Sequence, residues 1–147
     1  MEQISILKKM GLFQDLDSLE LIQVSKLVKH MRYEKDDMVL REGDHGASLF
    51  VVKTGQFRAY VGHGDSAKDL AVFKEADSFG ELALIDHAPR SASVQALTRG
   101  ECMEFDSDAL AVLMTHSDSL KLKLLSNLVR DLAAKLRRTN DRLVHLL

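Results

Sequence analysis

The residues of this sequence that are best suited to chemistry lie in one stretch, residues 79–94, which also contains the chain's only proline, Pro89. Gly80 allows a sharp turn or a close approach of the backbone to another group. Residues 81–85 can form one helical turn, whose free N–H groups and partial positive charge attract an anion. Pro89 then fixes a bend in the chain. The stretch therefore predicts a loop and a helix end arranged around an anionic group.

Two charged side chains in this stretch indicate what kind of molecule would bind. The planar guanidinium of Arg90 can hold a phosphate through two parallel hydrogen bonds, and Ser91 adds a hydroxyl beside it. Glu81 only accepts hydrogen bonds when it is ionised, so it suits a sugar hydroxyl rather than a phosphate. A carboxylate for ribose, with a helix end and an arginine for phosphate, together predict a nucleotide pocket.

Each of these residues also has a purely structural explanation. Gly80 is explained by a turn alone, and a serine such as Ser91 is common at the start of a strand. Glu81 and Arg90 could form a partly buried ion pair that ties the loop to the rest of the fold. It is the joint arrangement of the residues that favours the nucleotide pocket.

The same run, Phe-Gly-Glu-Leu-Ala-Leu…Pro-Arg-Ser-Ala-Ser-Val, resembles the phosphate-binding cassette of cyclic nucleotide-binding domains. This is the superfamily of the catabolite activator protein and the regulatory subunits of cAMP-dependent kinase. The resemblance covers about residues 12–140. Outside the cassette it rests on Leu12-Phe13 with Leu16, on Arg41-Glu42-Gly43-Asp44 with residues 48–52, and on Thr54-Gly55 with Phe57.

The resemblance implies a role for each residue of the cassette. Glu81 would accept a hydrogen bond from the ribose 2′-hydroxyl, and Arg90 would pair with the cyclic phosphate. Backbone groups would complete the ligand site at Gly80, Leu82, Ala83 and Ala92. Ser91 would contact either a phosphate oxygen or, in a syn purine, the base. Because Ser rather than Thr follows Arg90, cAMP is favoured over cGMP, although the sequence leaves both open.

A long helix is predicted from about residues 117–119 to near the end of the chain. A heptad spacing of 4 and 3 connects Leu125, Val129, Leu132, Leu136, Thr139, Leu143 and Leu146, of which only Thr139 is polar. Up to about Leu132 this stripe is expected to pack against the domain itself. Beyond Leu132 it predicts pairing with a second copy, and hence a homodimer. The resemblance implies that this helix closes over the purine, with Lys135, Arg138, Thr139 and Asn140 as candidate base contacts.

The charge of the chain is unevenly distributed. Residues 119–147 carry seven basic and two acidic side chains, which gives +5 on this helix and leaves −7 for the rest of a chain whose net charge is −2. The helix surface is either a solvated face, or a lid or a surface for a downstream protein partner, which the sequence does not name. The near-zero total argues against a protein that coats nucleic acid.

Several classes of protein are disfavoured by the composition. The 147 residues suit one domain, and the single cysteine, Cys102, excludes an internal disulfide and fits a reducing, cytoplasmic setting. No signal peptide and no apolar run of about 18 residues is present, so no membrane association is expected. No phosphate-binding loop, catalytic residue or metal-ligand spacing stands out, so we expect no enzyme, metal or cofactor. The chain ends at Leu147 without a helix-turn-helix, so it is not expected to bind DNA on its own.

The elements that must position the cassette predict an α+β fold. An Asp17–Glu20 capping box begins a helix over about residues 18–31, and a shorter helix precedes Gly11. Short strands are predicted at residues 38–40, 48–52, 57–61, 70–73, 93–97 and 102–105, separated by Gly and Asp turns. The single domain, residues 1–147, would comprise N-terminal helices (1–36), an antiparallel β-roll or jelly roll with a short cassette helix (37–106), and C-terminal helices (107–147).

The sequence therefore predicts a stand-alone cyclic nucleotide sensor whose C-terminal helix changes position when ligand binds. One alternative keeps the fold but has no ligand, as a structural or protein-interaction module with an internal Glu81–Arg90 pair. Another is a regulatory fragment of a larger transcription factor or channel.

Overall fold

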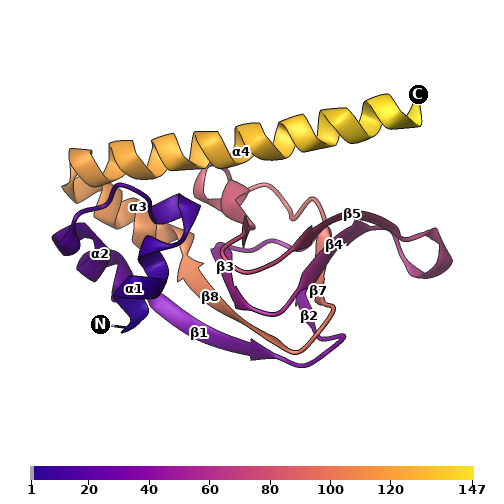
Figure 1. Ribbon diagram of the computed structural model, residues 1–147, viewed down its shortest axis with the longest axis horizontal. Helices are drawn as coiled ribbons and strands as arrows, with labels where there is room; N and C mark the ends of the chain where they lie inside the picture. The colour runs from indigo at the N-terminus through magenta and orange to yellow at the C-terminus, as the bar shows by residue number, and fades with distance from the viewer. Residues whose placement is uncertain (1) are drawn as a thin grey trace.

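The computed structural model describes residues 2–147 and confirms the predicted α+β roll. Helices at the start of the chain are followed by eight strands, a short cassette helix and two C-terminal helices (Figure 1). The helices are α1 (Glu2–Lys8), α2 (Ser18–Ser25), α3 (Ser107–His116) and α4 (Asp118–Leu146), with short 3-10 helices η1 (Gly11–Phe13), η2 (Gly64–Ser66) and η3 (Glu81–Leu84). The strands are β1 (Val28–Tyr33), β2 (Met38–Leu40), β3 (Ser48–Thr54), β4 (Phe57–Val61), β5 (Lys68–Phe73), β6 (Ser78–Phe79), β7 (Ser93–Ala96) and β8 (Gly100–Asp106).

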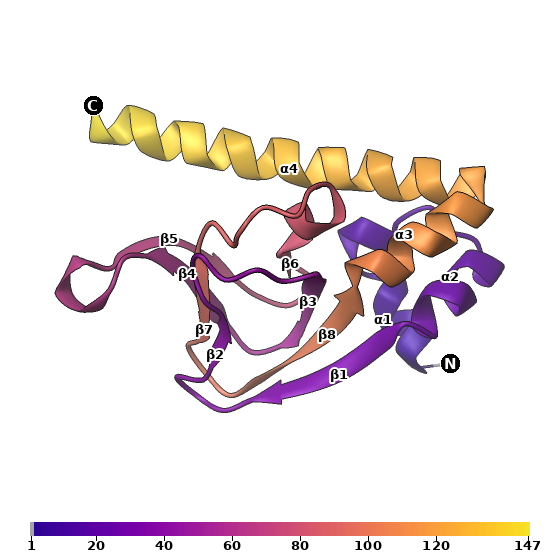
Figure 2. The ribbon, with the colours of Figure 1, turned by 180° about the vertical axis from the view of Figure 1, so that it is seen from behind.

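The described strands form two four-stranded antiparallel sheets, ordered β1-β8-β3-β6 and β2-β7-β4-β5. In both views α1, α2 and α3 gather at one end of the roll, and α4 runs along one side of the molecule toward the β4–β5 hairpin (Figures 1 and 2). Strand β5 is at the edge of its sheet, and β6 leads directly into η3. The cassette therefore lies beneath α4.

Helix α2 begins where the sequence predicts but ends earlier. The predicted capping box is present, because Asp17 accepts from the Glu20 N–H at 2.8 Å and Glu20 accepts from the Asp17 N–H at 2.9 Å. The predicted helix over residues 18–31 is wrong beyond Ser25. Residues 28–33 form β1 instead, paired with β8, so the segment 1–36 is not wholly helical. Ladder bonds to a strand about 70 residues away override the local helical spacing of apolar residues.

Two hydrophobic clusters support the two ends of the molecule. The first joins α1, α2, α3 and α4 to β3 and β8, and includes Phe13 stacked obliquely on Phe105 with ring centroids 5.1 Å apart. The second fills the roll. There the ring centroid of Phe79 lies 5.0 Å from that of Phe50 and 5.2 Å from that of Phe73, and the rings are nearly parallel. Phe79 therefore connects the core of the roll to the start of the cassette.

Helix α4 buries a different stripe from the one that the heptad spacing predicts. Its buried residues are Leu120, Leu124, Asn127 and Leu128. Of the predicted seam, Leu132 packs partly against the core, but the Leu125 and Val129 side chains are 37% and 65% exposed. The expectation that the seam packs against its own domain up to Leu132 is therefore wrong for these two residues. The residues that reach the core, Leu124 and Leu128, each precede a predicted seam residue by one position. Both rows are apolar, so the apolar pattern does not show which of them faces the core.

None of the helices in residues 2–147 is long and apolar enough to cross a membrane.

Candidate functional site

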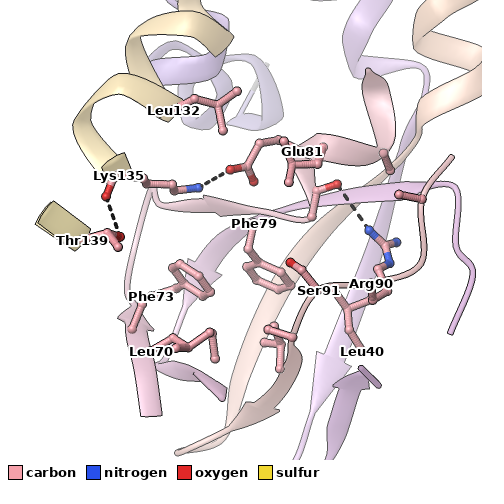
Figure 3. A pocket seen from close by; sticks show the side chains of 18 of the residues that line it. Leu40, Leu70, Phe73, Phe79, Glu81, Arg90, Ser91, Leu132, Lys135 and Thr139 are labelled. Carbon is pink, nitrogen blue, oxygen red and sulfur yellow. Dashed lines mark hydrogen bonds and ion pairs between the residues drawn. The ribbon is translucent and has the colours of Figure 1, made fainter. Parts of the chain in front are cut away.

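A pocket of about 650 Å³ lies between the cassette, the inner face of the roll and α4 (Figure 3). Its volume is in the range of small-molecule sites. Strands β4 and β5 form its floor with Phe79, while the cassette forms one wall and α4 covers it. Figure 3 shows Glu81 beside Lys135 at one side of the pocket and Arg90 at the other.

The structure brings most of the candidate residues together at this pocket. It is lined by all seven predicted cassette residues: Gly80, Glu81, Leu82, Ala83, Arg90, Ser91 and Ala92. Of the candidates on the C-terminal helix, Lys135, Arg138 and Thr139 line it. Asn140 is not among the lining residues of the described chain, because one further residue along the helix turns the side chain by about 100°.

Glu81 is the first residue of η3 and is almost fully buried. One carboxylate oxygen, Oε1, accepts from the Lys135 ammonium at 2.6 Å. The other, Oε2, is buried and has no hydrogen-bond partner within residues 2–147. Burial raises the pKa of Glu81, and the Lys135 ammonium opposes this rise only in part. Glu81 is therefore a buried carboxylate of which only one oxygen has a hydrogen-bond donor within the described residues.

Arg90 lies on the far side of the cassette and is held by backbone carbonyls. Its Nη2 donates to the Ser48 oxygen at 2.7 Å and its Nη1 to the Gly80 oxygen at 3.3 Å. Nε is buried and makes no hydrogen bond in the described part of the chain. Burial lowers the pKa of Arg90, and the nearby Glu104 carboxylate opposes this effect. The guanidinium retains donor capacity for an anion.

Two glycines provide the space that Arg90 occupies. A Cβ added to Gly46 would lie 2.7 Å from Nη2 and 2.9 Å from Nε of Arg90. Gly80 has a φ of 74°, in the left-handed region, and a Cβ there would lie 3.1 Å from Nη1. Gly80 is thus required both by its backbone conformation and by its contact with Arg90.

The internal ion pair that the alternative interpretation requires is not formed. Glu81 pairs with Lys135 of α4, whereas Arg90 donates to two carbonyl groups. The Glu81–Arg90 pair is therefore wrong as an explanation of why these residues occur together. Their unpaired polar atoms, Oε2 and Nε, leave one hydrogen-bond acceptor and one donor in the same cassette.

The apolar part of the pocket was missed from the sequence. Leu70, Phe73 and Phe79 point into it from β5 and β6, and Leu132 reaches it from α4 (Figure 3). Arg142 also lines the pocket and donates to the carbonyls of Asp69 and Leu70 on β5. The place of Arg142 in the pocket could have been predicted from its spacing, because Lys135, Arg138 and Arg142 at i, i+3 and i+7 share one helix face.

The arrangement can hold a molecule with three kinds of group. The cationic side chain of Arg90 and the glycine turn suit a phosphate, and the free oxygen of Glu81 suits a hydroxyl donor. The apolar floor of Phe73, Phe79 and Leu70 suits a flat ring. A nucleoside phosphate has all three. Within residues 2–147, no group of three or more His, Cys, Asp or Glu side chains is placed to bind a metal ion.

Comparison with known proteins agrees with this chemistry. The family model of the cyclic nucleotide-binding domain matches residues 30–117, which is more than half of the chain. The chain therefore belongs to the cyclic nucleotide-binding domain family.

Individual relatives extend the likeness to nearly the full length. A CRP-like cAMP-activated global transcriptional regulator of Mycobacterium tuberculosis is 28% identical over 143 residues, 97% of this chain and 62% of the regulator. A cyclic nucleotide-binding domain from Methylobacillus flagellatus superposes with a TM-score of 0.86 at 28% identity, covering 99% of this chain and 83% of that one. The regulatory domain of Toxoplasma gondii PKA in complex with cAMP has a TM-score of 0.69 at 30% identity, with coverage of 76% and 43%. The chain thus spans less than two thirds of the M. tuberculosis regulator.

Proposed function

We propose that this chain is a non-enzymatic sensor that binds cAMP in the pocket between the cassette and α4. The observation that carries the proposal is that two residues lining one pocket with an apolar floor each keep a buried polar atom without a hydrogen-bond partner in residues 2–147: Oε2 of Glu81 and Nε of Arg90. Glu81 would accept from the ribose 2′-hydroxyl, and Arg90 would bind the cyclic phosphate. The names of the M. tuberculosis and T. gondii relatives support cAMP, a cGMP-dependent protein kinase of Drosophila melanogaster is also similar, and Ser91 is compatible with either nucleotide.

The response to ligand would be a change in the position of α4. This helix lines the pocket with Lys135, Arg138 and Thr139, so a ligand that contacts them favours one helix position over others. A ligand shifts such an equilibrium only by the difference in its affinity for the two states. The basic surface of α4 would then be offered to a downstream protein.

The decisive experiment is the effect of cAMP and cGMP on thermal unfolding and in calorimetry. Wild type should be stabilised by cAMP more than by cGMP, because ligand that binds only the folded state raises the unfolding midpoint. Arg90→Leu should abolish the shift while the protein remains folded, since a charge-assisted bond contributes roughly 1.5–3 kcal/mol. Arg99→Leu, which removes an exposed arginine away from the pocket, is the matched control.

Two results would contradict the proposal. An undiminished cAMP shift in Arg90→Leu would show that Arg90 does not bind the phosphate. The lack of any shift or heat with either nucleotide in wild type would favour a ligand-free interaction module.

The proposed homodimer rests on the part of the heptad seam that the domain leaves uncovered. Leu125, Val129, Leu136 and Leu143 are exposed along one face of α4. The e positions beside this face hold the neutral residues Ser126, Ala133 and Asn140, so two parallel helices would not place like charges together there. Leu136→Lys should shift the mass measured by light scattering from dimer to monomer, whereas Val144→Lys, off the seam, should not. A wild-type chain that is monomeric with and without cAMP would exclude this dimer.

A further inference from the structure

Lys135 reaches from α4 into the pocket and is held there by two hydrogen bonds and a further ion pair. Its ammonium donates to the Ser78 carbonyl at 2.6 Å and to Glu81 Oε1 at 2.6 Å, and lies 3.0 Å from Asp131 Oδ2. Two of the three ammonium donors are therefore used in hydrogen bonds, and the charge is paired with Asp131 as well as with Glu81. The side chain is 24% exposed and also lies over the Phe73 ring, 5.6 Å from its centroid. A lysine held in this way has little capacity left to bind a ligand directly.

The two carboxylate oxygens of Glu81 differ in their hydrogen bonding. Oε1 is bound to Lys135, whereas Oε2 is buried and without a partner in the described chain. The carboxylate can therefore accept a hydrogen bond from a ligand hydroxyl through Oε2 without releasing Lys135 from Oε1. Ligand and helix need not compete for this group.

We propose that Lys135 is a positioning residue for the ligand: it holds the Glu81 carboxylate so that Oε2 is presented to the ribose 2′-hydroxyl, and it thereby couples recognition of that hydroxyl to docking of α4. This inference rests on the proposed binding of a cyclic nucleotide. It assigns selectivity for ribose over deoxyribose to a pair of residues, one in the cassette and one on α4.

The electrostatics of Glu81 explain why the carboxylate needs Lys135. Burial raises the pKa of Glu81, the negative charge of Asp131 adds to the rise, and Lys135 opposes both. Without the ammonium, a buried carboxylate is left uncompensated, so it takes up a proton or turns toward water. In either case the charge-assisted acceptor for the hydroxyl is lost.

Coupling through one carboxylate is reciprocal. If Lys135 strengthens the bond from Glu81 to the hydroxyl, the bound hydroxyl must strengthen the docking of α4 by the same factor. The other polar tie of this half of the helix, from Arg142 to the carbonyls of Asp69 and Leu70, lies on β5 and does not touch Glu81. Lys135 is therefore the contact through which the ribose site would report to α4.

The test is a thermodynamic cycle in which the Lys135 ammonium and the 2′-hydroxyl of the ligand are removed separately and together. Binding of cAMP and of 2′-deoxy-cAMP is measured by calorimetry for wild type, Lys135→Met and Arg137→Met. Wild type should prefer cAMP by about tenfold or more, the strength of a charge-assisted hydrogen bond. In Lys135→Met this preference should fall below about threefold, with most of the loss in cAMP affinity and little change for 2′-deoxy-cAMP. Arg137→Met removes a charge from an exposed position on the same helix and should retain the wild-type preference.

The outcomes separate this inference from the proposed function. Equal weakening of both ligands in Lys135→Met would mean that lysine acts by general attraction of the phosphate or by supporting the fold, and would overturn the inference. An unchanged preference would overturn it as well. Binding of 2′-deoxy-cAMP itself reports that the variant is folded, and Lys135→Arg, which retains a cation, should recover part of the preference. If wild type binds neither nucleotide, it is the proposed function that fails.

Discussion

The two halves of α4 each carry a lysine–glutamate ion pair to the rest of the domain, and the two pairs are nearly identical in geometry. Lys123 lies 2.6 Å from Oε1 of Glu20, and Lys135 lies 2.6 Å from Oε1 of Glu81. Both glutamates are 5% exposed, and the two lysine side chains are 29% and 24% exposed. What differs is the surroundings of each pair.

In the first half of the helix the ion pair is joined to the start of helix α2. Glu20 accepts from the Asp17 N–H as well as from Lys123, as part of the capping box of α2. Burial raises the pKa of Glu20, but the hydrogen bonds from Lys123, Asp17 and Ser119 outweigh that effect and bring the pKa below its ordinary value. Leu120, Leu124 and Leu128 of the same half are buried in the hydrophobic core. The first half of α4 is an anchor.

The second half keeps an acceptor unsatisfied. Glu81 has one partner where Glu20 has two, and its pKa moves in the opposite direction because burial prevails. Lys135 and Arg142 hold this half by polar contacts, and most of its large apolar side chains are exposed. The two ion pairs therefore differ in what surrounds the carboxylate: a backbone N–H adds a second hydrogen bond to Glu20, whereas Oε2 of Glu81 is buried without a hydrogen-bond partner within residues 2–147.

The largest expected effect lies in the anchor. Leu124→Ala should lower the free energy of unfolding by about 2–5 kcal/mol, because it removes a buried side chain and leaves a cavity. Urea denaturation measures this change. Val144→Ala, at an exposed position of the second half, should alter it by no more than about 0.5 kcal/mol. Equal losses in the two variants would mean that the halves do not differ in anchoring.

A smaller effect is expected in the pH dependence of stability, to which Glu20 and Glu81 should contribute with opposite signs. The lowered pKa of Glu20 means that the unfolded chain binds its proton more tightly, so the stability from Glu20 is present above the ordinary glutamate range and is lost as pH falls through the lowered value. The raised pKa of Glu81 has the opposite sign: the folded chain binds the proton more tightly, so stability falls as pH rises from the ordinary range through the raised value.

Thermal unfolding of the ligand-free protein from about pH 3 to pH 8 checks these signs. Glu20→Gln should flatten the acid side of the stability curve, whereas Glu81→Gln should remove a decline on the side above the ordinary glutamate range. The same change of slope in both variants would contradict the contrast drawn between the pairs.

The smallest effect on stability is expected at the end of α4. Arg142→Ala removes the ties to the carbonyls of Asp69 and Leu70, which lie at the surface. The free energy of unfolding should stay within about 0.5 kcal/mol of wild type, while amide exchange over residues 139–146 becomes faster. Arg137→Ala is the control on the same helix. Unchanged exchange in Arg142→Ala would show that this half is held by something other than the polar ties.

Much of the fold was predictable because its signals are local. The Asp17–Glu20 capping box, the six predicted strands and the long helix all depend on residues close together in the sequence. The sequence predicts helix for the start of β1 because the partner strand, β8, is distant in the sequence, and it does not reveal β6 because two residues are too few to show a period. The cassette was identifiable for the same reason as the capping box, since its residues occur in one run.

The sequence by itself determined which side chains could bind a nucleotide, because Gly80, Glu81 and Arg90 carry their chemistry within one short segment. It did not determine the partners of those side chains. Lys135 is 54 residues from Glu81, and the carbonyl of Ser48 is 42 residues from Arg90. Only the tertiary structure decided that Glu81 pairs with Lys135 and not with Arg90. The reason is that packing of the core sets which face of a helix lies against a distant loop. Within residues 2–147, that packing leaves one acceptor and one donor of the cassette without hydrogen-bond partners.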